Sequence, residues 1–377
     1  MDSRMLDSMK RYIKREFPEP IVEVLVFVSR HARPWKQLWF RRNIRFWRRP
    51  TIADLLEWSE RELELSFLLT HRCPCRCKHC DLWREKGEDD CLTMSTIQKL
   101  LSDARRKGFK TINITGGDPL MHRAFFEVLD LCRAFGFESI SVNTSGLLLK
   151  GKMLERFMNA PIDRVVLSLD GEATVHDEFR GVKGSHDRVL DVIEALSPKM
   201  EIQLSFVISS KNYDQLPYVI EIGKKYGCRV TCQPFDVSLS TSSRDRSLVL
   251  EDLHKIEALE RDLRTYKSKK GYSRTFSPTT KHIKAIVEYL RDSRSVKTPC
   301  LVGYWRAHVD AQGNIFPCYP LGKIGNVCSE DFGETWESDQ YNQVRKEMIK
   351  RNCPNCLLNC YTVINEGLAR YSAELEL

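Results

Sequence analysis

Six short aliphatic runs alternate with stretches of helical periodicity between residues 64 and 235, and this alternation constrains the fold more than any other feature. Strands that alternate with helices in this way form parallel sheets. Six such units are fewer than a closed barrel requires, so we predict an α/β fold with a partial (β/α)6 barrel of TIM type. The expected strands are Leu65 to Leu69, Thr111 to Thr115, Ser139 to Asn143, Val165 to Leu169, Ile202 to Ile208 and Arg229 to Cys232. The expected helices are Thr93 to Lys107, Ala124 to Phe135, Lys150 to Met158, Asp187 to Leu196 and Leu216 to Tyr226.

The pattern changes on both sides of this barrel. Charged helical stretches at Glu251 to Thr265 and Lys281 to Asp292 follow it, and a cysteine-containing tail with turn sequences comes after them. We therefore predict four parts: a basic, aromatic, helical extension over 1–60, the barrel over 61–235, a helical connection over 236–298 and a small domain over 299–377.

The chain has 14 cysteines in 377 residues. Its N-terminus lacks the basic-then-apolar order of a secretory signal, which predicts a cytoplasmic protein. Because that compartment is reducing, disulfides are disfavoured, and ligation of a metal or cluster is the leading interpretation of so many thiols.

Cys73, Cys77 and Cys80 have the spacing C-x3-C-x2-C directly after the first expected strand. Three thiolates can hold a 4Fe-4S cluster and leave the fourth iron open to a substrate or cofactor. Zinc is the rival interpretation, because Cys75 lies in the same run and would complete a four-thiolate site.

A second motif, Gly116 to Pro119, follows the second strand, where two glycines would allow a close backbone approach to a small polar ligand. Together with the cysteine loop and its His79, this segment resembles the cluster and GGEP motifs of the radical S-adenosylmethionine (SAM) superfamily. Asp118 stands where Glu is commoner in that family. The resemblance implies SAM binding by Gly116, Gly117, Asp118, Pro119, Asn143, Ser168 and Arg180.

The resemblance also implies an activity. Members of the family use the reduced cluster to cleave SAM to a 5′-deoxyadenosyl radical, which abstracts a hydrogen atom from a substrate, with flavodoxin or ferredoxin as the electron donor. We expect the same here, on a small-molecule or lipid-linked substrate in preference to a peptide. A non-catalytic iron-sulfur or zinc protein is the competing hypothesis.

The tail carries a second cysteine group, with Cys300, Gly313 and Cys318 around an expected hairpin and Cys353, Cys356 and Cys360 beyond it. It is similar to the auxiliary-cluster domain called SPASM with two clusters and Twitch with one. Five cysteines suffice for one 4Fe-4S cluster, so we predict the Twitch form with ligands Cys300, Cys318, Cys353 and Cys356, and Cys360 as a substitute. A zinc ribbon is the alternative.

Other side chains of the tail have less defined roles. Asp310 and Tyr319 are weak candidates for proton transfer, with a hairpin-turn acid and a packed aromatic ring as the favoured interpretations. Buried packing is expected for the cysteines outside the motifs, namely Cys91, Cys132, Cys228, Cys232 and Cys328.

Positive charge is concentrated near the N-terminus. Residues 30–50 hold eight Lys or Arg and no acid, which accounts for the formal net charge of +8. Arg mixed with Trp and Phe suits an anionic membrane surface, so we predict peripheral attachment through residues 21–50 to the inner face of the membrane. Packing within the protein and nucleic-acid binding are the alternatives, the latter less favoured.

Overall fold

The structure is a computed structural model that describes residues 63–84, 92–238, 243–276, 278–295 and 300–358. The helical extension expected over 1–60, with its basic segment 21–50, lies outside these ranges, as do Cys91 and Cys360. The strands are β1 (Glu64–Leu68), β2 (Thr111–Thr115), β3 (Ser139–Thr144), β4 (Arg164–Ser168), β5 (Glu201–Ile208), β6 (Arg229–Pro234), β7 (Arg306–Val309), β8 (Asn314–Phe316) and β9 (Gly325–Asn326).

The predicted strands and helices of the barrel are confirmed to within a few residues at each end. Seven of the helices are α5 (Met94–Arg106), α6 (Phe125–Ala134), α7 (Gly151–Met158), α9 (Ser185–Leu196), α10 (Leu216–Tyr226), α11 (Leu253–Ser268) and α12 (Thr280–Arg291). Four further helices have no counterpart in the prediction: α8 (Ala173–Arg180), α13 (Val302–Trp305), α14 (Phe332–Glu337) and α15 (Asp339–Ile349). Three of these helices have eight residues or fewer, which leaves little apolar periodicity to detect, and α15, with 11 residues, lies in the tail, for which no helix was predicted.

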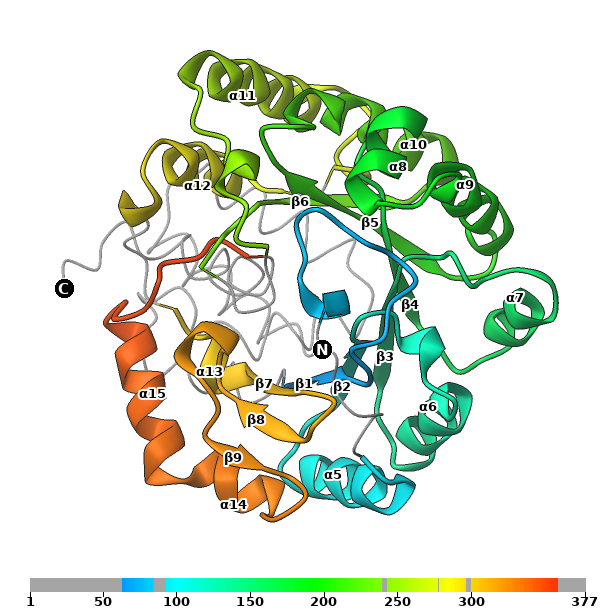
Figure 1. The fold of residues 1–377 in the computed structure, drawn as a ribbon, viewed down its shortest axis with the longest axis vertical. Helices are drawn as coiled ribbons and strands as arrows, with labels where there is room; N and C mark the ends of the chain where they lie inside the picture. The colour runs from blue at the N-terminus through cyan, green and yellow to red at the C-terminus, as the bar shows by residue number, and fades with distance from the viewer. Residues whose placement is uncertain (1–62, 85–91, 239–242, 277, 296–299, 359–377) are drawn as a thin grey trace, which may run out of the picture. The chain divides into compact units, whose positions relative to one another are not determined.

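One sheet runs through the described part of the chain, in the order β6-β5-β4-β3-β2-β1-β7-β8-β9. Strands β1 to β6 are parallel, and the helices lie on the outside of the curved sheet (Figure 1). The expected hairpin is confirmed as β7 and β8, and β7 pairs in parallel with β1. The tail therefore extends the barrel sheet beyond β1. The boundaries of the four expected parts remain a prediction.

The two faces of the barrel sheet differ in polarity. Outward side chains such as Phe67, Ile114 and Val142 are fully buried in one hydrophobic core with residues of the surrounding helices. Side chains alternate along a strand, so their neighbours face the interior. Many of these neighbours are hydroxyls and amides, such as Ser66, Asn113, Ser141, Asn143, Gln203, Ser205 and Thr231, and Val166 and Val207 are among the apolar exceptions. Such an interior is unlike the branched aliphatic layers that fill a packed barrel.

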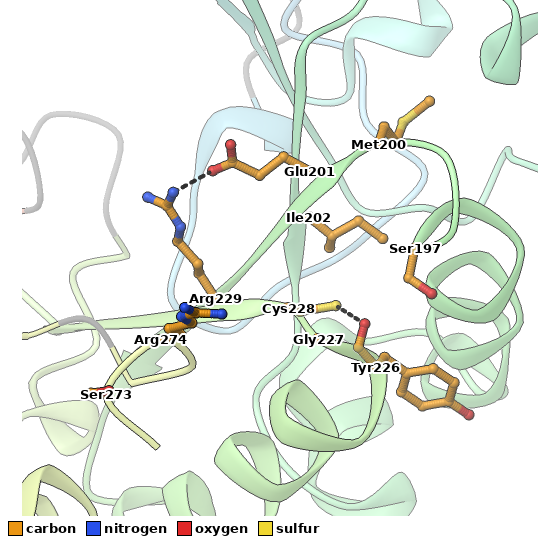
Figure 2. Close-up of a pocket in the computed structure, with 10 residues that line it drawn as sticks. All are labelled: Ser197, Met200, Glu201, Ile202, Tyr226, Gly227, Cys228, Arg229, Ser273 and Arg274. Atoms are coloured by element: carbon orange, nitrogen blue, oxygen red, sulfur yellow. Dashed lines mark hydrogen bonds and ion pairs between the residues drawn. The ribbon is translucent and has the colours of Figure 1, made fainter. Parts of the chain in front are cut away.

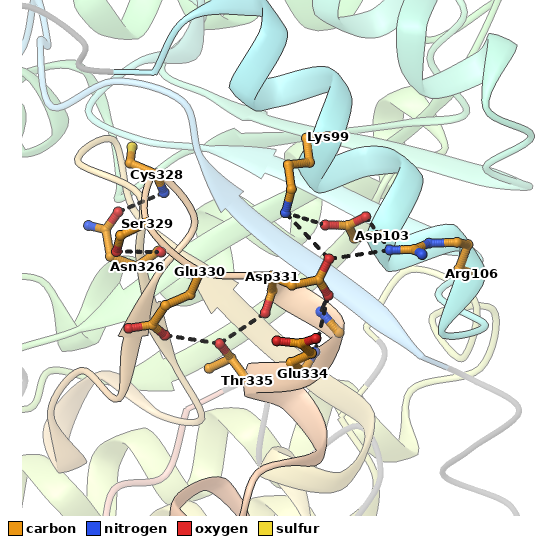
Figure 3. A network of polar contacts seen from close by, with 11 residues as sticks. Lys99, Asp103, Arg106, Asn326, Cys328, Ser329, Glu330, Asp331, Glu334 and Thr335 are labelled. Atoms are coloured by element: carbon orange, nitrogen blue, oxygen red, sulfur yellow. Dashed lines mark hydrogen bonds and ion pairs between the residues drawn. The ribbon is translucent and has the colours of Figure 1, made fainter.

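A charged network joins the tail to the barrel between α5 and the start of α14 (Figure 3). Asp331 caps α14 by accepting hydrogen bonds from the backbone N–H groups of Gly333 and Glu334. Its carboxylate also lies 3.4 Å from Lys99 Nζ and 3.3 Å from an Arg106 nitrogen, both of which contact Asp103 as well. The auxiliary part of the chain is thus fixed to the first barrel helix by polar contacts.

Candidate functional site

The cysteine loop begins where β1 ends, at the C-terminal end of the barrel strands. Cys75 and Cys77 are buried, and Cys73 and Cys80 are half-buried. Burial is the main cause that raises the pKa of Cys80 to about 11. The pKa of Cys75 is raised to about 12, first through its hydrogen bond with Cys73, and its thiol also bonds Cys77. Burial therefore does not distinguish Cys75 from the three predicted ligands. That Cys75 is not a cluster ligand stays a prediction.

Within the described ranges, no three His, Cys, Asp or Glu side chains are grouped to hold a single metal ion. The cluster assignment thus depends on the spacing of the thiols and on their surroundings. Those surroundings fit a cluster of thiolates, because the guanidinium of Arg180 lies against the loop and lowers the pKa of Cys75, Cys77 and Cys80 against the effect of burial.

Arg180 holds the cysteine loop by both its backbone and its side chain. Its carbonyl accepts a hydrogen bond from Arg76 N–H at 3.0 Å, and Nη1 lies 3.7 Å from Cys77 Sγ. The guanidinium forms an ion pair with Asp170, whose side chain is fully buried. Nε of Arg180 is buried without a hydrogen-bond partner among the described residues. A donor left unpaired in this position fits an anionic group such as the SAM carboxylate.

Helix α8 delivers Arg180 to this position. The next residue, Gly181, has φ +67 and ends the helix. A Cβ on Gly181 would lie 2.5 Å from the carbonyl oxygen of Arg76, so only glycine allows the helix end to approach the loop this closely. His79 of the loop stacks on Phe179 of the same helix, with ring centroids 4.7 Å apart.

The glycines of Gly116 to Pro119 have a role beyond the predicted contact with SAM, which stays a prediction. They let the chain approach the cysteine loop itself. A Cβ on Gly117 would lie 2.3 Å from the Arg72 carbonyl oxygen, and Gly117 N–H donates to the Thr70 carbonyl at 2.7 Å. The expectation of a close approach to a ligand overlooked this contact, because the spacing of two motifs does not reveal that they pack together.

Asp118 is fully buried, and its carboxylate is hydrogen-bonded to other groups of the protein. It accepts hydrogen bonds from the hydroxyls of Thr144 and Ser145 and from the backbone N–H groups of Ser145 and Leu120. Burial raises its pKa, and these hydrogen bonds lower it. The side chain therefore ties the end of β2 to the end of β3, and a contact between this segment and SAM stays a prediction.

Two other predicted SAM contacts lie at neighbouring strand ends. Asn143 is near the end of β3, and its Oδ1 is buried without a hydrogen-bond partner among the described residues. Ser168 ends β4 opposite Ser205 of β5. The predicted residues thus share the C-terminal end of the sheet. The sequence interpretation missed Asp170, which lies two residues after the end of β4 at Ser168.

The auxiliary cysteines come from three segments. Cys300 is buried before α13, Cys318 follows β8, and Cys353 and Cys356 follow α15. Between the last two, Pro354 precedes Asn355 with φ +70, a residue pair that suits a type II turn and would bring both thiols to one side. These four cysteines stay predicted ligands.

Two expectations about the tail have definite outcomes. Asp310 stabilises the hairpin turn, as the favoured interpretation expected. Its carboxylate accepts hydrogen bonds from the backbone N–H groups of Gln312 and Asn314 and from the Asn314 side-chain amide. The expectation that Cys328 is buried is wrong, since it lies exposed in the turn after β9, where its N–H binds Asn326. Cys132, Cys228 and Cys232 are buried as expected.

A pocket of about 530 Å³ lies at the other end of the strands, away from the cysteine loop (Figure 2). Residues at the starts of β5 and β6 line it, together with Arg274. Glu201 in this pocket pairs with Arg164 at 2.9 Å and with Arg229 at 3.4 Å. Because strand-end loops build the active site at the C-terminal face of such barrels, we assign no catalytic role to this pocket.

Two family models match the chain. The model of the radical SAM superfamily matches residues 67–222, and the model of the SPASM iron-sulfur cluster-binding domain matches residues 300–361. The chain is therefore a radical SAM enzyme of the SPASM type. The first domain implies a 4Fe-4S cluster and SAM, and the second implies auxiliary iron-sulfur binding. The number of auxiliary clusters stays a prediction.

Relatives and solved structures of different functions resemble the chain. It is 26% identical to mycofactocin maturase MftC of Mycolicibacterium smegmatis, over 81% of this chain and 79% of the relative. It is 25% identical to the AdoMet-dependent heme synthase of Methanosarcina barkeri, over 78% and 87%. A probable GTP 3′,8-cyclase of Saccharolobus solfataricus is 29% identical over 44% of this chain, which spans about half (54%) of that relative.

The fold agrees with two groups of solved structures. SuiB of Streptococcus suis matches with a TM-score of 0.61 and 19% identity, over 75% of this chain and 68% of that one. The AdoMet-bound structure of anSMEcpe matches with a TM-score of 0.60 and 15% identity, over 82% and 97%.

Proposed function

We propose that this enzyme abstracts a hydrogen atom from a carbon of a peptide held in the interior of the barrel. Bound SAM and the reduced cluster, held by Cys73, Cys77 and Cys80, supply the radical chemistry. The observation that carries the choice of substrate is the row of buried hydroxyl and amide side chains on the inner face of the sheet.

Neighbouring strands contribute to this row in register. Ser66, Asn113 and Ser141 are directly opposite one another on β1, β2 and β3, and Ser141 Oγ donates to Asn113 Oδ1 at 2.9 Å. His308 continues the row on β7, opposite Ser66. Its Nδ1 is buried without a hydrogen-bond partner among the described residues. Burial lowers the pKa of His308, so the ring is neutral and can accept a hydrogen bond.

A peptide matches such a lining. Each of its residues carries a backbone donor and an acceptor that need partners once they leave water. Hydroxyl and amide side chains both donate and accept, so they serve either group. An acyl or isoprenoid chain would instead call for an apolar lining, which argues against the lipid-linked substrate expected from the N-terminal segment.

Charged substrates are supported less well. Charged inward side chains lie at the N-terminal ends of the barrel strands in the described part of the chain, and they pair with one another. Glu64 pairs with Arg306, and Arg164 pairs with Glu201. A heavily carboxylated small molecule would compete with these pairs. The names of MftC, a maturase, and of the SuiB complex with its precursor peptide SuiA agree with a peptide substrate.

Deuterium transfer tests the proposal directly. Reconstituted enzyme, SAM and dithionite are incubated with deuterated extract of cells that make this protein, divided into peptide and small-molecule fractions. We expect deuterium to be transferred from the peptide fraction to 5′-deoxyadenosine. Protease treatment of that fraction should abolish the transfer. Transfer from the small-molecule fraction alone would show that the substrate is not a peptide. Cys77→Ala is the control that removes the chemistry.

We also propose that residues 21–50 attach the enzyme to anionic membranes. No helix among the described residues is both long and apolar enough to span a bilayer. Flotation with vesicles of anionic phospholipid should carry the full chain at low salt and not a chain that starts at Thr51. Equal flotation of the two would exclude this role.

A further inference from the structure

The turn between β7 and β8 reaches the loop that carries the cluster cysteines. Nε2 of Gln312 in this turn is 3.1 Å from Nδ1 of His71, which is two residues before Cys73. The contact follows from the topology. Because β7 pairs in parallel with β1, the turn after β7 and the loop after β1 emerge at the same end of the sheet.

The backbone of Gln312 is held firmly. Its N–H donates to Asp310 Oδ1 at 3.0 Å, and its carbonyl accepts from the Asn326 amide at 2.9 Å. Asn326 belongs to β9, so two elements of the tail fix the point from which the Gln312 side chain extends. Fixed in this way, the side chain can restrain the group it contacts.

The same stretch of the loop is also held by the Gly116 to Pro119 segment. Gly117 N–H donates to the Thr70 carbonyl at 2.7 Å, and Asp118 N–H donates to the Arg72 carbonyl at 2.8 Å. Residues 70–72 therefore lie between a barrel turn, which binds their backbone, and the tail hairpin, which binds the His71 side chain. Cys73 is the next residue along the chain.

We propose that Gln312 is a positioning residue, through which the hairpin of the auxiliary domain holds the loop of the catalytic cluster at His71. The hairpin lies between Cys300 and Cys318, two predicted ligands of the auxiliary cluster. Loss of the auxiliary cluster therefore alters the position of Cys73 through this contact. The proposal does not depend on the identity of the substrate.

SAM binding followed by electron paramagnetic resonance tests the contact. In the dithionite-reduced protein, Gln312→Ala should raise the SAM concentration at half-maximal spectral change roughly fivefold, the factor expected for one ordinary hydrogen bond. The double variant with His71→Ala should be no worse than the worse single variant. Gln343→Ala, at an exposed site on α15, should titrate like the wild type.

Two results would overturn the proposal: an unchanged midpoint in Gln312→Ala, or additive effects in the double variant. If Gln312→Ala fails to fold, Gln312→Met decides, because it keeps a side chain of similar length and removes the hydrogen bond to His71. A midpoint raised as far as in His71→Ala supports the proposal, and a wild-type midpoint in Gln312→Met overturns it.

A second arm tests the connection to the auxiliary site. Cys353→Ser, which removes a predicted auxiliary ligand, should shift the SAM midpoint in the wild-type background and add little in Gln312→Ala. The same added shift in both backgrounds would show that the auxiliary site does not act through Gln312.

Discussion

Loss of the Arg180 guanidinium should leave a buried carboxylate without its counter-ion. The side chain of Asp170 is 0% exposed and that of Arg180 is 10% exposed. Removing one partner of a buried ion pair costs about 3 to 5 kcal/mol. We therefore expect Arg180→Met, which keeps most of the aliphatic stem, to lower the free energy of unfolding of the iron-free chain by that amount.

The loss in free energy of unfolding caused by Arg180→Met should depend on pH. Burial raises the pKa of Asp170, and Arg180 opposes that effect. In Arg180→Met the opposition is gone, so the pKa rises further above its ordinary value. A carboxyl group whose pKa is raised by folding stabilises the fold below its unfolded pKa and loses this contribution as pH rises through the folded pKa. The cost of Arg180→Met should accordingly be small in acid and grow toward neutral pH.

Urea unfolding of the full chain, followed by circular dichroism, measures the cost. The matched control is Arg188→Met, whose partner Asp191 lies 3.3 Å away with a side chain that is 68% exposed, and which should cost about 1 kcal/mol or less. Arg180→Met with Asp170→Asn should recover much of the loss, because no buried charge remains. If Arg180→Met costs no more than Arg188→Met, or if the double variant recovers nothing, the reasoning is refuted.

Three further predictions concern the cluster loop and the tail. Gly117→Ala should sharply lower the iron bound by the catalytic site, because its Cβ would overlap the Arg72 carbonyl, whereas Gly151→Ala, whose Cβ meets nothing within 4 Å and whose φ of +49 adds only local backbone strain, should bind iron like the wild type; iron analysis after anaerobic reconstitution decides, and equal iron in both contradicts the packing argument. Cys77→Ser should lose about four of the roughly eight irons expected for two clusters, and Cys75→Ser should lose none; a loss of iron in Cys75→Ser would show that Cys75 is a cluster ligand, and about four irons with one zinc in the wild type would favour the four-thiolate zinc interpretation. Asp331→Ala should lower the free energy of unfolding by about 1 kcal/mol through loss of the α14 cap. Burial raises the Asp331 pKa, but hydrogen bonds and Lys99 lower it to about 2, so the difference from wild type should be present above the ordinary pKa of 3.8 and shrink as pH falls toward 2; a difference that grows in acid would contradict this assignment.

Much of the barrel and the class of chemistry could be predicted from the sequence, because both are local signals. Alternating apolar patterns mark strands and helices over a few residues, and the spacing of the three cysteines can be recognised within one loop. The hairpin around Gly313 was equally visible, since turn residues act over four or five positions. Helix α8 was missed because only Val175 and Phe179 mark its apolar side.

The sequence by itself determined the strands of the barrel and the class of enzyme, and the tertiary structure decided which groups hold the predicted site residues. Neither the pairing of β7 with β1 nor the contact of Gln312 with His71 has a local signature, because their partners are more than 200 residues apart. The contacts of Gly117 with Arg72 and of Arg180 with Cys77 also join different segments of the chain and have no local signature. Contacts of this kind arise only when strands meet in one sheet, where backbone spacing and side-chain volume, rather than residue type alone, determine which groups touch.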